Sequence, residues 1–410
     1  MSKPIRVLYI SYDGMTDSLG QSQVIPYIEG LSKRGFSFHL MSFEKEERFE
    51  ANRKMIAERC VKSNITWIPL SYTKKPPILS TIKDIRTALK TAKKYHEQVG
   101  FEIIHCRSYI SAFVGYAFQK KYGTKFVFDM RGFWADERVD GKIWNLKNPL
   151  FKMVYSYFKK KEKTFLQAAD YVVSLTENGA NEIRSWDYLD ADTFKIKVIP
   201  CCVDVGLFNP EAINPHRLRE LKRALGITPN DFILGYVGSI GTWYMLDEML
   251  AFFKVFSDNN PNAKFLFVTG ENPEMIKGKA TELGINNEKL LFASTVHKYV
   301  PLHIALFDYS LFFIQAAYSK KASSPTKQGE IMAMGVPVLC NAGVGDTDYI
   351  VHKYESGQVL TELTEAAFAK VNLDAAAFDK NKLRKGAIAF FGLENGVSRF
   401  EEVYRNVLNR

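Results

Sequence analysis

The sequence predicts two α/β domains, each built on a parallel β-sheet. Short apolar segments alternate with helical patterns along the whole chain, which is typical of parallel α/β layers. At 410 residues the chain is too long for one hydrophobic core of ordinary size. A segment with prolines at 200, 210, 215 and 229 interrupts the alternation and indicates a linker. Two such sheets are expected to bind a ligand between them, at the carboxyl ends of their strands.

Apolar runs place the strands in order along the chain. The first domain is expected to use Ile5–Ser11, Phe38–Phe43, Ile65–Pro69, Ile103–Cys106, Lys125–Asp129, Tyr171–Leu175 and Lys197–Pro200. The second is expected to use Ile233–Val237, Phe265–Thr269, Leu290–Phe292, Tyr309–Phe313 and Val338–Cys340. We place the domains at residues 1–202 and 203–387, and expect a helix over about 388–410 to cross back to the first domain.

The sequence lacks the patterns of a membrane-spanning, a secreted or a disulfide-stabilised protein. No apolar run reaches the roughly 20 residues that span a bilayer, and the N-terminus enters a strand without the pattern of a signal peptide. The five cysteines show no metal-ligand spacing and imply no disulfide framework. We therefore expect a cytoplasmic protein.

The positive charge is confined to the first half. Residues 1–202 hold 33 Lys and Arg against 22 Asp and Glu, a net charge of +11, so residues 203–410 hold the other 22 and 23, a net charge of −1. The first half is therefore expected to meet an anionic partner, with a membrane surface, a lipid-linked phosphate, an acidic glycan or nucleic acid as candidates.

The loop after the first strand contains Gly14 and Gly20 and leads into a helix expected over Gln21–Leu31. Glycines between a strand and a helix allow close approach of the backbone to a ligand, which makes Gly20 a candidate donor contact. The alternative is a plain strand-to-helix turn. The spacing is not GxGxxG, so no dinucleotide fingerprint is present.

Ionisable residues gather where two strands of the first domain end. His105 and Arg107 close one strand, and Asp129 and Arg131 follow the next, ahead of the acidic and basic run at 136–138. Strand ends carry the active sites of such sheets, so His105, Asp129 and Arg131 are catalytic candidates. The alternative is an ion-pair network that supports this edge of the domain.

Phe151–Gln167 combines aromatic and apolar residues with five lysines. On a helix this pattern is found in segments that lie on a membrane surface, with lysines that extend toward the headgroups. A core helix with a solvated lysine face has the same pattern.

Glycine-containing loops follow the strands of the second domain and offer backbone N–H groups to a diphosphate. The candidate donor contacts in these loops are Gly238, Ser239, Thr242, Thr269 and Gly270, and Val296 lies in a later loop expected to face a base. The loop that contains Gly238 lacks the Lys-Ser/Thr pair of a P-loop, so we do not expect nucleotide hydrolysis. Asp346 and Asp348 form a D-x-D pair but have no third acidic partner nearby in the sequence, and we expect no metal.

The stretch from Lys320 to Asn341 holds the most informative residues. Pro325 delays a helix, expected over Thr326–Met334, and Ser324, Thr326 and Lys327 surround its start. Free N–H groups, the helix dipole and a cation favour a phosphate there. Glu330, one turn later, is placed to accept hydrogen bonds from sugar hydroxyls, so the stretch predicts a nucleotide-sugar site.

These motifs, in this order, resemble the family 4 retaining glycosyltransferases of the GT-B fold. The resemblance rests on DSLGQSQVIPY, VIPCCVDVGLF, GYVGS and SPTKQGEIMAMGVPVLCN, and covers nearly the full chain. It implies two Rossmann-like domains facing a cleft, Glu330 on the ribose, and Thr326 and Lys327 on the diphosphate. The sequence departs from the family pattern at three points. Ala322 lies where many members carry a Glu eight residues before the one that matches Glu330. The loop GSIGTWY lacks the Lys or Arg that many members have there, and Asp129 lies where many members have His.

The predicted function is retaining transfer of a sugar from a UDP- or GDP-sugar to a saccharide or lipid-linked glycan in cell-surface polysaccharide synthesis. The donor is a co-substrate, no cofactor or metal is expected, and Lys327 also acts catalytically on the leaving diphosphate. The expected location is the cytoplasm, with peripheral contact at the inner membrane face. The alternatives are a nucleotide-sugar epimerase of the same fold and a non-catalytic basic protein that binds nucleic acid, for which no basic-aromatic stripe is found.

Overall fold

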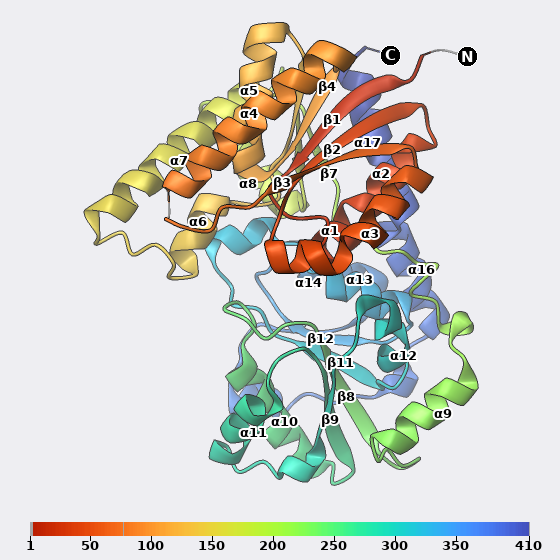
Figure 1. The fold of residues 1–410 in the computed structure, drawn as a ribbon. Helices are drawn as coiled ribbons and strands as arrows, with labels where there is room; N and C mark the ends of the chain where they lie inside the picture. The colour runs from red at the N-terminus through yellow and green to blue at the C-terminus, as the bar shows by residue number, and fades with distance from the viewer. Residues whose placement is uncertain (1–2, 77, 410) are drawn as a thin grey trace. The chain divides into compact units, whose positions relative to one another are not determined.

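The computed structural model describes residues 3–76 and 78–409. The chain divides into two compact units (Figure 1). The first unit takes Met1–Pro200, Lys321–Ser323 and Leu393–Arg410, and the second takes Cys201–Lys320 and Ser324–Gly392. The main division thus falls at Pro200, and the tripeptide at 321–323 belongs to the first unit although it lies late in the sequence.

In the described residues the first unit has a seven-stranded parallel sheet in the order β3-β2-β1-β4-β5-β6-β7. Its strands are β1 (Ile5–Ser11), β2 (Phe36–Glu44), β3 (Ile65–Ser71), β4 (Ile103–Arg107), β5 (Lys125–Asp129), β6 (Tyr171–Ser174) and β7 (Ile196–Val198). The strand order reverses direction between β1 and β4, and ligands of doubly wound sheets bind at such a switch point. β4 and β5 are almost wholly buried, as central parallel strands must be.

Helices connect these strands and cover the sheet (Figure 1). They are α1 (Ser18–Gln23), α2 (Ile25–Ser32), α3 (Glu46–Lys62), α4 (Leu79–Val99), α5 (Ser108–Tyr122), α6 (Trp134–Asp140), α7 (Pro149–Ala168), α8 (Glu177–Arg184) and the C-terminal α17 (Leu393–Val407). α17 returns to the first unit and packs on α2. A side chain at Gly30 would meet Val397 at 2.6 Å, so glycine permits this close packing.

The second unit has a six-stranded sheet in the order β10-β9-β8-β11-β12-β13, whose recorded pairs are all parallel. Its strands are β8 (Phe232–Val237), β9 (Ala263–Val268), β10 (Leu290–Ala293), β11 (Tyr309–Phe312), β12 (Val338–Asn341) and β13 (Gly357–Leu360). The switch point lies between β8 and β11. The loop after β8 and the segment after β11 therefore reach the same edge of the sheet.

The helices of the second unit surround a core rich in phenylalanine. They are α9 (Pro215–Ala224), α10 (Leu246–Asn259), α11 (Pro273–Glu282), α12 (Val300–Ile304), α13 (Thr326–Ala333), α14 (Thr347–Tyr354), α15 (Glu365–Phe368) and α16 (Lys380–Phe391). Short 3-10 turns occur at Pro210–Ala212, Asn287–Lys289, His297–Tyr299, Tyr318–Ala322 and Ala375–Ala377. α13 packs against α16, and Gly329 faces Phe391 and Val203 where a side chain would meet both at 2.8 Å.

The parallel α/β prediction and all twelve predicted strands are confirmed, with small shifts at their ends. The single helix expected over Gln21–Leu31 is wrong. It is two helices that break at Val24, because Pro26 has no N–H to continue the first helix. Strand β13 was missed because it is a short, half-buried edge strand that begins at a glycine.

Two further expectations change at the ends of the second unit. The segment expected to be a linker folds in large part into the second unit, where α9 begins at Pro215 after its cap Asn214. The terminal helix expected from about residue 388 is interrupted. Gly392 separates α16 in the second unit from α17 in the first.

Candidate functional site

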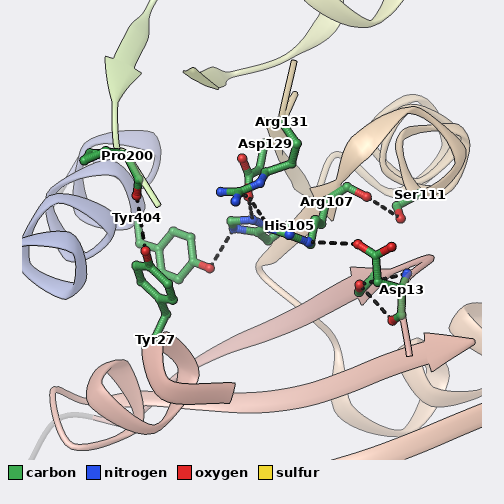
Figure 2. A network of polar contacts seen from close by, with 10 residues as sticks. Asp13, Tyr27, His105, Arg107, Ser111, Asp129, Arg131, Pro200 and Tyr404 are labelled. Atoms are coloured by element: carbon green, nitrogen blue, oxygen red, sulfur yellow. Dashed lines mark hydrogen bonds and ion pairs between the residues drawn. The ribbon is translucent and has the colours of Figure 1, made fainter. Parts of the chain in front are cut away.

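In the first unit, four of the predicted residues meet at the ends of β4 and β5. Arg107 lies opposite Asp129 in the sheet register, and His105 projects from the same face of β4 as Arg107. Asp129 Oδ2 lies 3.5 Å from His105 Nε2, 3.9 Å from Arg107 Nη1 and 3.8 Å from Arg131 Nη1 (Figure 2). We call these four residues the Asp129 cluster.

The Asp129 carboxylate is 1% exposed, and within the described chain neither of its oxygens makes a hydrogen bond. Burial alone would raise the pKa of Asp129, but the neighbouring Arg131, His105 and Arg107 outweigh burial and lower it. Burial also lowers the pKa of His105. At neutral pH the cluster therefore pairs an ionised carboxylate with a neutral imidazole and two guanidinium groups.

The backbone around the cluster is strained. Arg131 has φ +59° and Ser108 has φ +68°, values that residues other than glycine rarely adopt. Ser108 directly follows the end of β4, and Arg131 lies two residues after the end of β5. Strain of this kind persists where surrounding structure enforces it and is concentrated at functional sites.

Asp136 belongs to a different network. Its carboxylate accepts hydrogen bonds from Tyr155 Oη and Lys159 Nζ, both at 2.8 Å. Lys159 also pairs with the buried Glu162, which Tyr109 contacts through its hydroxyl. The ion-pair interpretation therefore holds for Asp136, whose partners tie α6 to α7. Ion pairs also join the Asp129 cluster, and its catalytic role stays a prediction.

The loop after β1 is shaped by a buried acid. Glu44 accepts hydrogen bonds from the backbone N–H groups of Met15 and Thr16, at 2.7 and 3.1 Å, and from the Thr16 hydroxyl. Gly20 lies buried in α1, where a Cβ would come within 2.3 Å of the Gly14 carbonyl oxygen. Glycine is thus required there for packing, and its predicted contact with the donor stays a prediction.

In the second unit, Lys327 occupies an aromatic cage. Its ammonium lies 3.7 Å from the ring centroid of Tyr244 and 4.1 Å from that of Tyr236. The residue is 7% exposed, and Nζ makes no hydrogen bond within the described part of the chain. Burial lowers the pKa of Lys327 well below its ordinary value, and Glu330 opposes only part of that effect.

The start of a helix and a glycine loop lie beside Lys327. Lys327 lies in the first turn of α13, whose N-cap Pro325 makes no side-chain capping bond. Gly238, with φ +116°, approaches so closely that a Cβ would lie 3.1 Å from Nζ. Uncapped N–H groups, a cation and a glycine loop are what a diphosphate requires. Tyr244 lies in the loop where many members of the family that this sequence resembles carry a Lys or Arg.

Glu330 has a partner in this structure. Its Oε1 lies 2.8 Å from His297 Nε2, and the hydrogen bond to Glu330 raises the pKa of His297. His297 also packs beside Phe208, with ring centroids 5.4 Å apart. Val296, the residue expected to face a base, is 64% exposed next to it. His297, which follows Val296 in the sequence, thus brings Val296 near Glu330.

The other predicted donor residues lie in loops of the second unit. Ser324 Oγ accepts a hydrogen bond from the Cys201 N–H at 3.2 Å, and Thr326 begins α13. Ser239, Thr242 and Gly270 are exposed, and Thr269 Oγ1 accepts from the Glu271 N–H. Asp348 Oδ2 accepts from the Gly343 N–H at 3.2 Å, and the described residues contain no group of three His, Cys, Asp or Glu placed to hold a metal.

The sequence did not single out Tyr236, Tyr244, His297 or Tyr404. The one available signal was the GTWY loop, where aromatic residues replace an expected cation. A second aromatic residue of that loop, Trp243, covers Lys320 at 3.6 Å. The loop thus places an aromatic ring on each of two lysines.

Comparison with known proteins identifies the family. Residues 22–207 match the model described as Glycosyltransferase Family 4, and residues 219–382 match Glycosyl transferases group 1. The chain belongs to glycosyltransferase family 4. The predicted family and GT-B fold are thereby confirmed.

Among the relatives of this glycosyltransferase, the D-inositol 3-phosphate glycosyltransferase of Segniliparus rotundus is 25% identical over 267 residues. That match covers 64% of the chain but 55% of the relative, so the chain matches only about half of the relative's length. Sucrose-phosphate synthase of Thermosynechococcus elongatus superposes with a TM-score of 0.73 at 17% identity and 99% coverage of both chains. Anabaena HepE, solved with UDP and glucose, gives 0.67 at 15% identity, covering 98% of this chain and 99% of its own.

None of the helices in the described residues is long and apolar enough to cross a membrane. The likeness to the solved structures shows the fold alone.

Replacement of Lys327 by alanine is expected to lower the turnover of sugar transfer by about 10²-fold or more, because it removes a buried cation from the start of α13. Steady-state kinetics with a nucleotide-sugar donor measures the effect. Lys353→Ala is the matched control, because Lys353 also lies near two tyrosine rings but is exposed on α14. Near wild-type turnover in Lys327→Ala would remove Lys327 from the catalytic machinery.

Proposed function

We propose that this glycosyltransferase moves a sugar, with retention of anomeric configuration, from a UDP- or GDP-sugar to a saccharide or lipid-linked glycan in cell-surface polysaccharide synthesis. The observation that carries the proposal is the buried, unbonded ammonium of Lys327 at the uncapped start of α13. A buried cation without a hydrogen bond is costly. A nucleotide diphosphate supplies the missing acceptor.

The assignment of each donor contact follows from this geometry. Lys327, the N–H groups at Thr326 and the Gly238–Ser239 loop take the diphosphate, and Glu330 takes the ribose hydroxyls. Ribose must displace or share His297, the present partner of Glu330 at 2.8 Å. The sugar lies near Thr269, Gly270 and Ser324, and the base near Val296.

The chemistry of transfer assigns opposite charges to the two ends of the donor. The leaving diphosphate gains negative charge, which Lys327 and the helix start stabilise without a metal. The sugar gains oxocarbenium character, which an anionic group stabilises. Asp129 is our candidate for that role, because Arg131, His105 and Arg107 hold it ionised and neither of its oxygens makes a hydrogen bond within the described chain.

A panel of nucleotides tests the donor class. We expect UDP and UDP-sugars to raise the melting temperature of the protein, since HepE of the same fold was solved with UDP, and we expect the gain to vanish in Lys327→Ala. Thermal melting with UDP, GDP and their sugars measures this. Stabilisation by GDP alone would reassign the base, and stabilisation by neither would contradict the nucleotide-sugar site.

Product analysis separates this proposal from an epimerase of the same fold. A transferase gives at most slow hydrolysis of its donor when no acceptor is present, whereas an epimerase converts the sugar without any acceptor. Incubation of donor alone, followed by identification of the sugar, decides between them. The inositol phosphate in the relatives' names makes inositol phosphates the first acceptors to add beside saccharides.

We also propose peripheral contact with the inner face of the cytoplasmic membrane through the start of α7. The interior face of α7 packs in the first-unit core through Phe158, Phe165 and Leu166. Its N-terminal half leaves Leu150, Met153 and Tyr157 at 48%, 63% and 48% exposure. Exposed lysines accompany them at positions 142, 147, 152 and 160, the combination that binds anionic interfaces.

Vesicle flotation tests this contact. We expect binding to phosphatidylglycerol vesicles at low salt, weaker binding to phosphatidylcholine, and a clear loss of binding in Met153→Asp, because the change places a charge against the lipid surface. Met275→Asp is the control, since Met275 is an exposed methionine of α11 in the other unit. Equal binding by both variants would contradict a role for α7.

A further inference from the structure

The last helix of the chain supplies a buried hydroxyl to the Asp129 cluster. Tyr404 of α17 is fully buried, and its Oη lies 2.8 Å from Nδ1 of His105 (Figure 2). The two residues are 299 positions apart in the sequence. The other ring nitrogen of His105, Nε2, faces Asp129 at 3.5 Å. Tyr404, His105 and Asp129 therefore form a continuous line from α17 to the end of β5.

The imidazole is clamped in this orientation. The ring of Tyr9, from β1, stacks on it with centroids 4.2 Å apart and planes 21° apart. Phe400 lies one turn before Tyr404 on α17, and its ring centroid is 5.4 Å from that of His105. Because the rings of Tyr9 and Phe400 pack against it, the His105 ring cannot flip about its Cβ–Cγ bond, which would put a carbon in the place of each nitrogen, without moving α17 or β1.

The polar neighbours decide which nitrogen carries the proton. A neutral imidazole has one N–H and one lone pair. An N–H on Nδ1 would aim the Nε2 lone pair at the Asp129 carboxylate, which is repulsive. A proton on Nε2 faces the carboxylate instead, and leaves Nδ1 to accept from the Tyr404 hydroxyl. Burial raises the pKa of Tyr404 well above its ordinary value, so that hydroxyl keeps its proton to donate.

We propose that Tyr404 is a positioning residue for the reaction, which fixes His105 as the Nε2–H tautomer and so keeps its N–H directed at Asp129. This proposal rests on the proposed role of Asp129 in transfer. Tyr404 itself touches no substrate in this role. It acts through His105, much as a carboxylate orients a histidine in other enzymes by holding one ring nitrogen.

The other charged groups around His105 are consistent with this role. Arg107 and Arg131 flank Asp129 at 3.9 and 3.8 Å, and Arg107 Nε also pairs with Asp13 at 3.3 Å. The two guanidinium groups disfavour the positively charged imidazolium form of His105, whereas Asp129 favours it. α17 is held in place by Arg34, whose Nη1 lies 2.9 Å from Glu401, and by Lys197, 2.7 Å from Glu402.

Tyr404→Phe tests the proposal, because it removes the hydroxyl and keeps the ring. Without the donor, Nδ1 competes for the proton, and Asp129 loses its Nε2–H for part of the time. We expect turnover to fall about five- to tenfold, the scale of one lost buried hydrogen bond. We also expect the acid limb of the turnover profile to move to higher pH, while the KM for the donor stays unchanged.

Tyr27→Phe is the matched control. Tyr27 is also a buried tyrosine of the first unit that contacts Phe400, with ring centroids 5.5 Å apart, but its hydroxyl donates to the Pro200 carbonyl at 3.2 Å. It should lower stability as much as Tyr404→Phe does, without moving the acid limb. An equal shift in both variants, or a shift in neither, would overturn the role of Tyr404.

Nitrogen-15 NMR of histidine-labelled wild-type protein tests the tautomer without any assay of activity. We expect His105 to carry its proton on Nε2, and to lose this preference in Tyr404→Phe. A proton on Nδ1 in the wild type overturns the inference whatever the kinetics show. Asp129→Asn separates the two proposals. Wild-type transfer by that variant, with the Nε2–H tautomer intact, would contradict the role of Asp129 in catalysis and with it the kinetic consequence of Tyr404.

Discussion

The second unit is organised around an ammonium group that has lost its water. Lys327 lies in a place where no described oxygen accepts from Nζ, and where two tyrosine rings offer the only close partners. Cation–π contact replaces part of the lost hydration. The remainder of the cost is recovered when an anion arrives, so the site is prepared for a ligand of opposite charge.

Other features of the unit follow from that requirement. Gly238 has φ +116°, which residues with a side chain rarely adopt, and it approaches Nζ closely. α13 begins without a capping side chain, which leaves its first N–H groups for the anion that we propose. Glu330 sits one turn on, close enough to oppose in part the effect of burial on the pKa of Lys327. The position of each residue can thus be traced to a single buried charge.

The first unit presents the opposite case. There a buried carboxylate, Asp129, is held ionised by two guanidinium groups and an imidazole, and its own oxygens remain without hydrogen bonds in the described chain. Both units use the switch point of a parallel sheet, where neighbouring loops diverge. A cation for the leaving group and an anion for the sugar are the two charges that transfer from a nucleotide sugar demands.

Sequence patterns predicted the parts of this arrangement that depend on local order. Apolar runs located β4 and β5. Pro325 placed the start of α13 at Thr326, and the predicted end at Met334 lies one residue beyond the observed end. Lys327 and Glu330 share a helix, so their relation was readable from spacing. The contacts of His105 with Tyr404, and of Lys327 with Tyr236 and Tyr244, join distant segments, and spacing carries no information about them. Asp136 shows the same limit, since its partners on α7 decide its structural role.

Proton uptake on UDP binding tests the role of the Lys327 charge most directly. Where the pH exceeds the lowered pKa of Lys327 but not its ordinary value of about 10.4, the buried ammonium of the free protein gives up its proton, and a bound diphosphate restores it. Calorimetric titrations with UDP near pH ~8, where a terminal phosphate is already ionised, in buffers of different ionisation enthalpy count the protons. We predict uptake that is largest at a pH between the pKa values of Lys327 in the free and bound states, and that disappears in Lys327→Met. Binding of UDP without proton uptake at any pH in the range, or equal uptake in Lys327→Met, would contradict this role.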